Sequence, residues 1–121
     1  MTPRQQLIHR YMDGFRRSDH ATILGCLTDD VVWHIHGLRT TRGKTEFDDE
    51  IENPAFDGSP ELTVDRTIDA GEVIVVTGTG AGHHREHGPF RFAYNDLFTF
   101  REGLIAQVDS YVVALDQELV Q

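Results

Sequence analysis

The chain has 121 residues and a formal net charge of −9, so it is a poor candidate for binding nucleic acid or an anionic membrane surface. No apolar run approaches the roughly 20 residues of a membrane helix, and the lone Cys26 excludes a disulfide within the chain. We expect one globular domain over residues 1–121, and the cytoplasm as its location.

The first part of the chain predicts two helices. Apolar residues recur at helical spacing over residues 3–16, and Tyr11 lies on the apolar side of that helix. Ser18 or Asp19 would cap the second helix, whose buried side would extend over residues 21–27. Tyr11 is therefore either a core residue or a hydroxyl that reaches into a site.

A turn is predicted at residues 28–30, followed by a strand over residues 31–36. One face of this strand would carry Val31, Trp33 and Ile35, and the other Val32, His34 and His36. We expect the first set to face the core, so both histidines should point away from it unless a bulge turns one inward.

His34 and His36 also form a His-x-His pattern, which can bind a metal when a third ligand is near. His83, His84 or His87 could supply that ligand, but nothing in the sequence brings them close. No carboxylate follows the pair over the next seven residues. A metal site is therefore an alternative that we do not favour, and we expect no metal and no cofactor.

The middle of the chain predicts a short acidic helix at residues 45–52 and two strands, at residues 61–69 and 72–80. In the first strand Leu62, Val64, Arg66 and Ile68 would share one face. The glycines Gly78, Gly80 and Gly82 suit strand bending or a close approach of other groups.

Residues 89–113 predict a long hairpin with a turn at residues 101–103. One face of its first strand would carry Phe90, Phe92, Tyr94, Asp96, Phe98 and Phe100. In its second strand, Leu104, Ala106, Val108, Ser110 and Val112 would share a face. Asp96 stands out as a carboxylate in an aromatic row. It is either a structural hydrogen-bonding group or a functional acid whose pKa is raised by an apolar site.

Helices that precede a long meander of strands predict an α+β fold, with the helices packed on one face of an antiparallel sheet. Two segments, RYMDGFRRSDHATILGCLTDDVVWHIH (residues 10–36) and NDLFTFREGLIAQVDSY (residues 95–111), resemble the nuclear transport factor 2-like superfamily. Within it the chain is most similar to the ketosteroid isomerases and the SnoaL-like group. TDDVVWHIHG and GKTEF are similar to SnoaL-like patterns.

The resemblance implies a cone: a strongly bent antiparallel sheet packed on about three N-terminal helices, with an internal apolar cavity. It implies that a small apolar molecule binds there, against the side chains of Trp33, Ile35, Phe98, Val108 and Val112. It also implies a homodimer through the convex sheet face, which would carry His34, Asp109 and Tyr111.

In ketosteroid isomerase a tyrosine of the first helix and a protonated aspartic acid of a late strand form an oxyanion hole. The matching residues here are Tyr11 and Asp96. The position of the isomerase's general base is occupied by Ile35, which takes no proton. The adjacent His36 could replace it if its side chain turned into the cavity mouth. An epoxide hydrolase set with Asp96 and Arg66 is a weaker match.

From this resemblance we expect a SnoaL-like enzyme that catalyses proton transfer without a cofactor on an apolar cyclic or conjugated carbonyl substrate. Such an enzyme could be an isomerase, a cyclase, or a related lyase or hydrolase. Tyr11, Asp96 and His36 are its expected catalytic residues. The alternative is a non-catalytic module that binds an apolar ligand or a protein partner.

Overall fold

The structure is a computed structural model that describes residues 1–52 and 54–115. These residues form three helices and six strands: α1 (Pro3–Arg16), α2 (His20–Leu24), β1 (Leu27–Ile35), β2 (Arg39–Arg42), α3 (Gly43–Ile51), β3 (Glu61–Asp69), β4 (Val73–His84), β5 (Gly88–Arg101) and β6 (Leu104–Ala114). None of these helices is long and apolar enough to cross a membrane.

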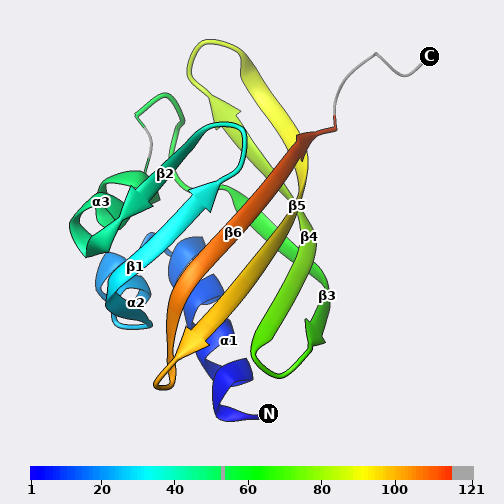
Figure 1. The fold of residues 1–121 in the computed structure, drawn as a ribbon. Helices are drawn as coiled ribbons and strands as arrows, with labels where there is room; N and C mark the ends of the chain where they lie inside the picture. Colours follow the sequence, from blue (N-terminus) through cyan, green and yellow to red (C-terminus); the bar gives the residue numbers. More distant parts are fainter. Residues whose placement is uncertain (53, 116–121) are drawn as a thin grey trace.

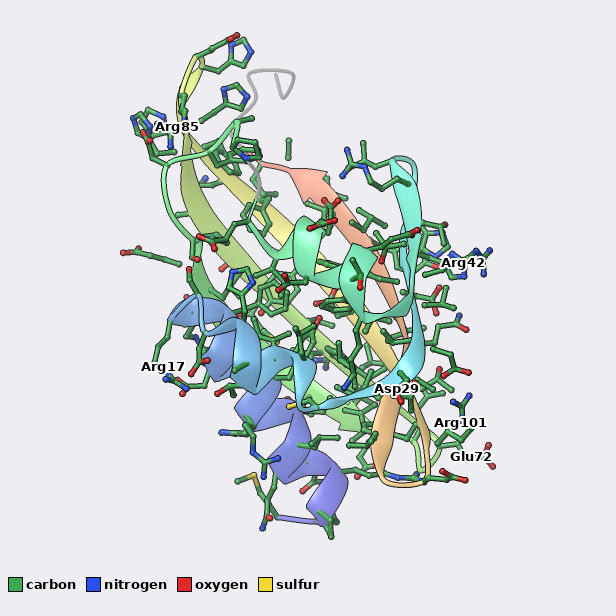
Figure 2. The ribbon with its side chains drawn as sticks, turned by 90° about the vertical axis from the view of Figure 1, so that its left-hand side faces the viewer. Arg17, Asp29, Arg42, Glu72, Arg85 and Arg101 are labelled. Carbon is green, nitrogen blue, oxygen red and sulfur yellow. The ribbon has the colours of Figure 1, made fainter. Side chains whose placement is uncertain are left out.

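The six strands form one curved sheet in the order β2-β1-β6-β5-β4-β3 (Figure 1). The ladders are antiparallel except that β1 pairs parallel with β6, which the sequence did not predict. The helices lie together on the inner, concave side of the sheet, and charged side chains such as Arg42 and Arg85 extend from the periphery (Figure 2). The α+β class and the bent sheet packed against helices are confirmed.

Local signals explain where the first helix begins and ends. Thr2 caps α1 and forms a reciprocal capping box with Gln5, and Pro3 occupies the first helical position, where its missing N–H costs little. The next helix is shorter than predicted. Asp19 caps it through the backbone N–H of Thr22, but α2 ends at Leu24. The turn predicted at residues 28–30 is wrong, because β1 already begins at Leu27.

Two β-bulges change the faces that simple alternation predicts. In β6 the pairing steps from Gln107 to Ile105, so Ala106 is the extra residue and Ile105 takes the inward position. The prediction that Leu104 and Ala106 share the face of Val108 is therefore wrong. In β3 a similar step between Val64 and Arg66 places Arg66 and Ile68 on the opposite face from Leu62 and Val64, so the prediction that these four residues share one face is wrong.

The glycines of β4 allow aromatic rings of β5 to lie directly on the strand. A Cβ atom at Gly80 would lie 2.2 Å from Cζ of Phe92, and one at Gly82 would lie 2.8 Å from Cζ of Phe90. A Cβ atom at Gly78 would lie 2.0 Å from the carbonyl oxygen of Thr63 and 2.7 Å from the Tyr94 hydroxyl. The expected close approach is thus present, and these rings occupy the space where strand β4 has no side chains.

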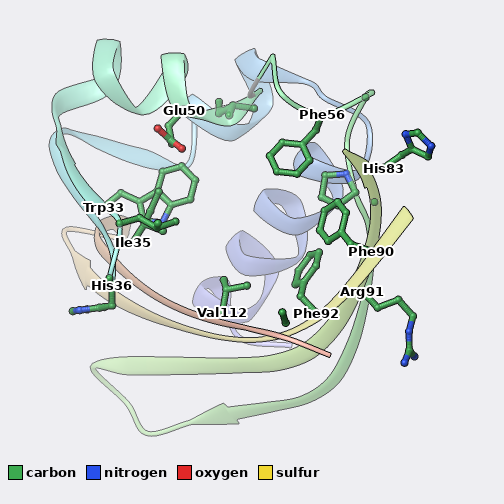
Figure 3. A pocket seen from close by; sticks show the side chains of 17 residues that line it. Trp33, Ile35, His36, Glu50, Phe56, His83, Phe90, Arg91, Phe92 and Val112 are labelled. Atoms are coloured by element: carbon green, nitrogen blue, oxygen red, sulfur yellow. The ribbon is translucent and has the colours of Figure 1, made fainter. Parts of the chain in front are cut away.

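The core lies between α1, α3 and the inner face of the sheet. Its fully buried members include Ile23, Phe47, Ile74, Phe98, Ile105 and Val108. The core is filled near the β5–β6 turn. It opens toward the other end of β5 and β6, and there the space between the sheet and α3 becomes a pocket (Figure 3).

Candidate active site

A pocket of about 610 Å³ opens between the inner sheet face, α3 and the loop that precedes β3. This volume is in the range of small-molecule sites. Its wall is mostly apolar and includes Trp33, Ile35, Leu38, Ile51, Phe56, Pro60, Phe90, Phe92 and Val112. The sequence-predicted lining residues Trp33, Ile35 and Val112 are all part of it (Figure 3).

The inner end of the pocket is a chamber of about 160 Å³ that shares Trp33, Ile35, Pro60, Phe92 and Val112 with the larger space. Here polar groups enter the wall: Tyr11, Tyr94, Asp96 and Ser110. The site therefore has an apolar mouth and an inner end where a few polar groups interrupt an apolar wall. Phe98 and Val108, which were expected in the lining, are both 0% exposed and lie within the packed core instead.

Asp96 is the carboxyl group in the wall of the inner chamber. It lies on β5 between Tyr94 and Phe98 on the inner face, and it pairs with Ser110 of β6 across the ladder. Burial raises the pKa of the Asp96 carboxyl from 3.8 to about 6, and a hydrogen bond from the Ser110 hydroxyl acts in the opposite direction. The carboxyl can thus gain and lose a proton near physiological pH.

Ser110 also joins Asp96 to the indole of Trp33. The Trp33 Nε1–H donates a hydrogen bond of 2.9 Å to the Ser110 Oγ. This bond fixes the orientation of the Trp33 ring in the pocket wall. The same ring stacks on Phe47, with 4.5 Å between ring centroids. The chain Trp33–Ser110–Asp96 therefore holds both the wall and the acid in place.

Tyr11 reaches the chamber from α1 and is 2% exposed. Its ring packs edge-on against Phe98, with 5.1 Å between ring centroids, and lies tilted against Phe15, with 5.0 Å between centroids. Burial first, and then the nearby Asp96 charge, raise the pKa of the Tyr11 phenol well above its usual value of 10.0. Tyr11 therefore keeps its proton and can act as a hydrogen-bond donor, and the structure brings it to Asp96 as expected.

Tyr94 is a second phenol of the same chamber, and we did not assign it a role from the sequence. Its hydroxyl donates a 3.3 Å hydrogen bond to the Thr63 carbonyl oxygen. Burial and the Asp96 charge raise the pKa of Tyr94 to about 12. Two-residue alternation placed Tyr94 beside Asp96 on one strand face, so that signal was present. The role of Ser110 could not be found without the register of β5 and β6.

His36 lies elsewhere. Its Nε2 is 2.9 Å from Oδ1 of Asp109, and its ring stacks on Tyr111 with 4.3 Å between centroids. Its backbone borders the pocket mouth, but its ring points away from the pocket (Figure 3). No bulge turns this histidine inward, and the structure does not bring it to Tyr11 and Asp96. His34 does not join them either, because its Nδ1 forms a hydrogen bond of 2.9 Å with the Thr40 hydroxyl.

The remaining candidate groups do not form a second reactive centre. Arg66 is exposed and lies on the outer sheet face after the β3 bulge, so it does not complete an Asp–Arg set with Asp96. In the turn between β4 and β5, the His84 Nδ1 accepts hydrogen bonds from the backbone N–H groups of Glu86 and His87. Among residues 1–52 and 54–115, no three His, Cys, Asp or Glu side chains are placed to hold a metal ion.

Comparisons with known proteins support the fold. The family model described as a SnoaL-like domain matches residues 8–108. A sequence search of curated proteins finds no match.

Solved structures share the fold at low identity. A nuclear transport factor 2-like protein of unknown function from Burkholderia pseudomallei superposes with a TM-score of 0.84 at 23% identity, over 93% of this chain and 92% of its own. TerC, co-crystallised with polyporic acid, gives 0.82 at 21% identity, over 93% and 92%. A candidate SnoaL-like polyketide cyclase from Shewanella putrefaciens gives 0.81 at 14% identity, over 93% and 90%.

Residues 8–108 include most of α1, all of α3 and most of the sheet, and the superpositions extend over nearly the whole chain. The protein therefore belongs to the family of SnoaL-like domains, with the nuclear transport factor 2-like fold.

Proposed function

We propose that this protein is a small-molecule enzyme that catalyses cofactor-independent proton transfer on an apolar cyclic or conjugated carbonyl substrate. The observation that carries the proposal is Asp96, a carboxyl with a pKa of about 6 at the inner end of an apolar pocket. Raised carboxyl pKa values of this kind are typical of groups that serve as general acids and bases.

Asp96 itself is the proton carrier of this proposal, because His36 lies outside the pocket. Above a pH of about 6 the carboxylate prevails, and it can take a proton from the carbon next to the substrate carbonyl. The electron pair of that C–H bond forms a carbon–carbon double bond, and the π pair of the carbonyl moves to its oxygen, which gives an enolate. Asp96 then returns the proton to a carbon of the conjugated system, so that an isomer forms and the enzyme regains its starting state.

The Tyr11 phenol stabilises the enolate oxygen, whereas the Tyr94 hydroxyl already donates its one proton to the Thr63 carbonyl oxygen. Tyr11 remains protonated because of burial, so it is a donor at any pH at which Asp96 acts as a base. A neutral donor in a largely apolar chamber favours the charged intermediate over the neutral substrate. This role for Tyr11 agrees with the sequence-based expectation. Asp96 changes role: as a carboxylate it has no proton to donate, and so it acts as the base.

The comparisons support the type of ligand. A related structure holds polyporic acid, and another relative is a candidate polyketide cyclase. The aromatic wall formed by Trp33, Phe90 and Phe92 suits a flat, cyclic compound of the same general kind.

The test is exchange of the α-protons of cyclic ketones in deuterated water, measured by NMR with wild type, Asp96→Asn and Tyr11→Phe. A ketone that exchanges with wild type should exchange at least about 100-fold more slowly with Asp96→Asn. Tyr11→Phe should reduce the rate by about 10–100-fold. Equal exchange rates in wild type and Asp96→Asn would rule out Asp96 as the base.

A second candidate function is a non-catalytic module, and Ile35 favours it, since this side chain lines the pocket at the position where ketosteroid isomerase has its base. In that case phenols would bind the pocket and change the fluorescence of Trp33, the one tryptophan of the chain, while no ketone would exchange protons. Binding without exchange over a broad ketone series would favour this module over the enzyme.

We also propose a homodimer through the outer sheet face. Tyr111 is 45% exposed there and Val113 is 62% exposed, and Ile68 and Leu115 add to the exposed apolar residues. Sedimentation of wild type and of Val113→Asp tests the dimer. A monomeric wild type would contradict it.

A further inference from the structure

Glu50 is a carboxylate in the otherwise apolar mouth of the pocket. It lies on α3, lines the pocket together with Leu38, Ile51 and Phe56, and has a side chain that is only 19% exposed. Charged side chains are seldom kept on an apolar surface without a partner. The groups around Glu50 therefore indicate whether it can bind a ligand.

The other charged or titratable side chains of this wall are directed outward. In Figure 3 the side chains of His36, His83 and Arg91 point away from the pocket, whereas Glu50 is drawn near Trp33 at the pocket wall. His83 is near Asp57, at 3.3 Å, and His36 bonds Asp109. Of the lining residues in the described part of the chain, Glu50 is therefore the charged group that stays at the aromatic wall of the pocket.

Arg39 holds this carboxylate in place. The Arg39 Nη1 is 2.6 Å from Oε2 of Glu50, which links the start of β2 to α3 across the mouth. A carboxylate can accept about four hydrogen bonds, so a ligand donor can still bind the same group. A pre-oriented acceptor of this kind costs little ordering entropy when a ligand arrives.

We propose that Glu50 determines substrate specificity by accepting a hydrogen bond from a hydroxyl group at the outer end of the substrate. The substrate class is then a cyclic or conjugated compound with a carbonyl or phenol oxygen at one end and a hydroxyl at the other. This inference rests on the proposed function, because Tyr11 must bind the first oxygen beside Asp96 at the inner end of the pocket.

The test uses two pairs of rigid phenols of different length: para-hydroxybiphenyl with its para,para′-diol, and para-hydroxystilbene with its para,para′-diol. Binding is followed through Trp33 fluorescence in wild type, Glu50→Ala and Arg39→Ala. Wild type should bind the diol of at least one pair about tenfold more tightly than the matching monophenol. Glu50→Ala should abolish this preference, because it should weaken binding of the diol much more than binding of the monophenol.

Arg39→Ala is the matched control, because it breaks the same ion pair but keeps the carboxylate. It should retain the diol preference. The inference is overturned if wild type shows no preference in either pair, if Glu50→Ala keeps it, or if Arg39→Ala loses it to the same extent. Failure of the proposed function gives a different result: monophenol binding would then be unchanged in Asp96→Asn and Tyr11→Phe.

Discussion

Asp96 and Asp109 lie almost side by side in the β5–β6 ladder, yet they face opposite sides of the sheet. Asp96 pairs with Ser110, and Asp109 pairs with Leu97 in the adjacent position. Neighbouring residues of a strand point to opposite faces, so one step along the chain separates an apolar chamber from the outer surface.

On the inner face Asp96 is surrounded by aromatic rings and meets polar groups only through Ser110 and the nearby phenols. Its charged form is disfavoured there, and its pKa rises to about 6. On the outer face Asp109 bonds His36 at 2.9 Å and the Gln107 side chain at 3.0 Å. An aspartate on the outer face, Asp109, is thus a partner of His36, whereas an aspartate on the inner face, Asp96, is a candidate base.

The comparison teaches that residue type alone did not identify the reactive group. Histidine is the residue type most often used as a base near neutral pH, but His36 lies on the outer face against Asp109 and Tyr111. Asp96 is a carboxyl whose pKa burial raises to about 6. The face of the strand decides which of the two can meet a ligand in the pocket.

The largest effect on stability should come from a side chain added at a glycine of β4, where aromatic rings of β5 lie on the inner face. Gly78→Ala would place a methyl group 2.0 Å from the Thr63 carbonyl oxygen and 2.7 Å from the Tyr94 hydroxyl. We expect a loss of more than about 3 kcal/mol in the free energy of unfolding, since backbone must move. Thr77→Ala, next to it on the outer face, should cost only about 1 kcal/mol. Urea unfolding measures both, and similar losses would contradict the difference between faces.

The second prediction concerns the pH dependence of stability. The pKa of Asp96 is higher in the folded state, about 6, than its ordinary value of 3.8. The folded protein therefore holds this proton more tightly, and the contribution of Asp96 to stability falls as the pH rises through this interval. The full difference corresponds to about 3 kcal/mol.

Asp96→Asn removes this dependence, because the amide does not ionise. We expect the unfolding free energy of Asp96→Asn relative to wild type to increase by up to about 3 kcal/mol between about pH 4 and pH 7. Asp109→Asn is the control on the outer face. A relative stability of Asp96→Asn that stays constant with pH would mean that Asp96 is not perturbed by burial.

The smallest effect is expected on the outer face. His36→Ala removes a partly exposed contact with Asp109 and the stacking on Tyr111. We expect a change of less than about 1 kcal/mol in unfolding free energy, as for other exposed ion pairs. Ketone exchange rates should stay within about twofold of wild type, since they depend on groups inside the pocket. A decrease in the exchange rate similar to that of Asp96→Asn would contradict this prediction and indicate that His36 takes part in proton transfer.

The sequence by itself determined the α+β class, the first helix, the aromatic face of β5 and the positions of Tyr11 and Asp96. These follow from local rules, because helical spacing and two-residue alternation bring residues of one element to one side whatever surrounds them. The bulges in β3 and β6, the parallel pairing of β1 with β6, and the Trp33–Ser110–Asp96 chain depend on register between distant segments. Only the tertiary structure could decide them, because pairing and burial across the sheet set which groups meet, and burial sets the pKa of Asp96.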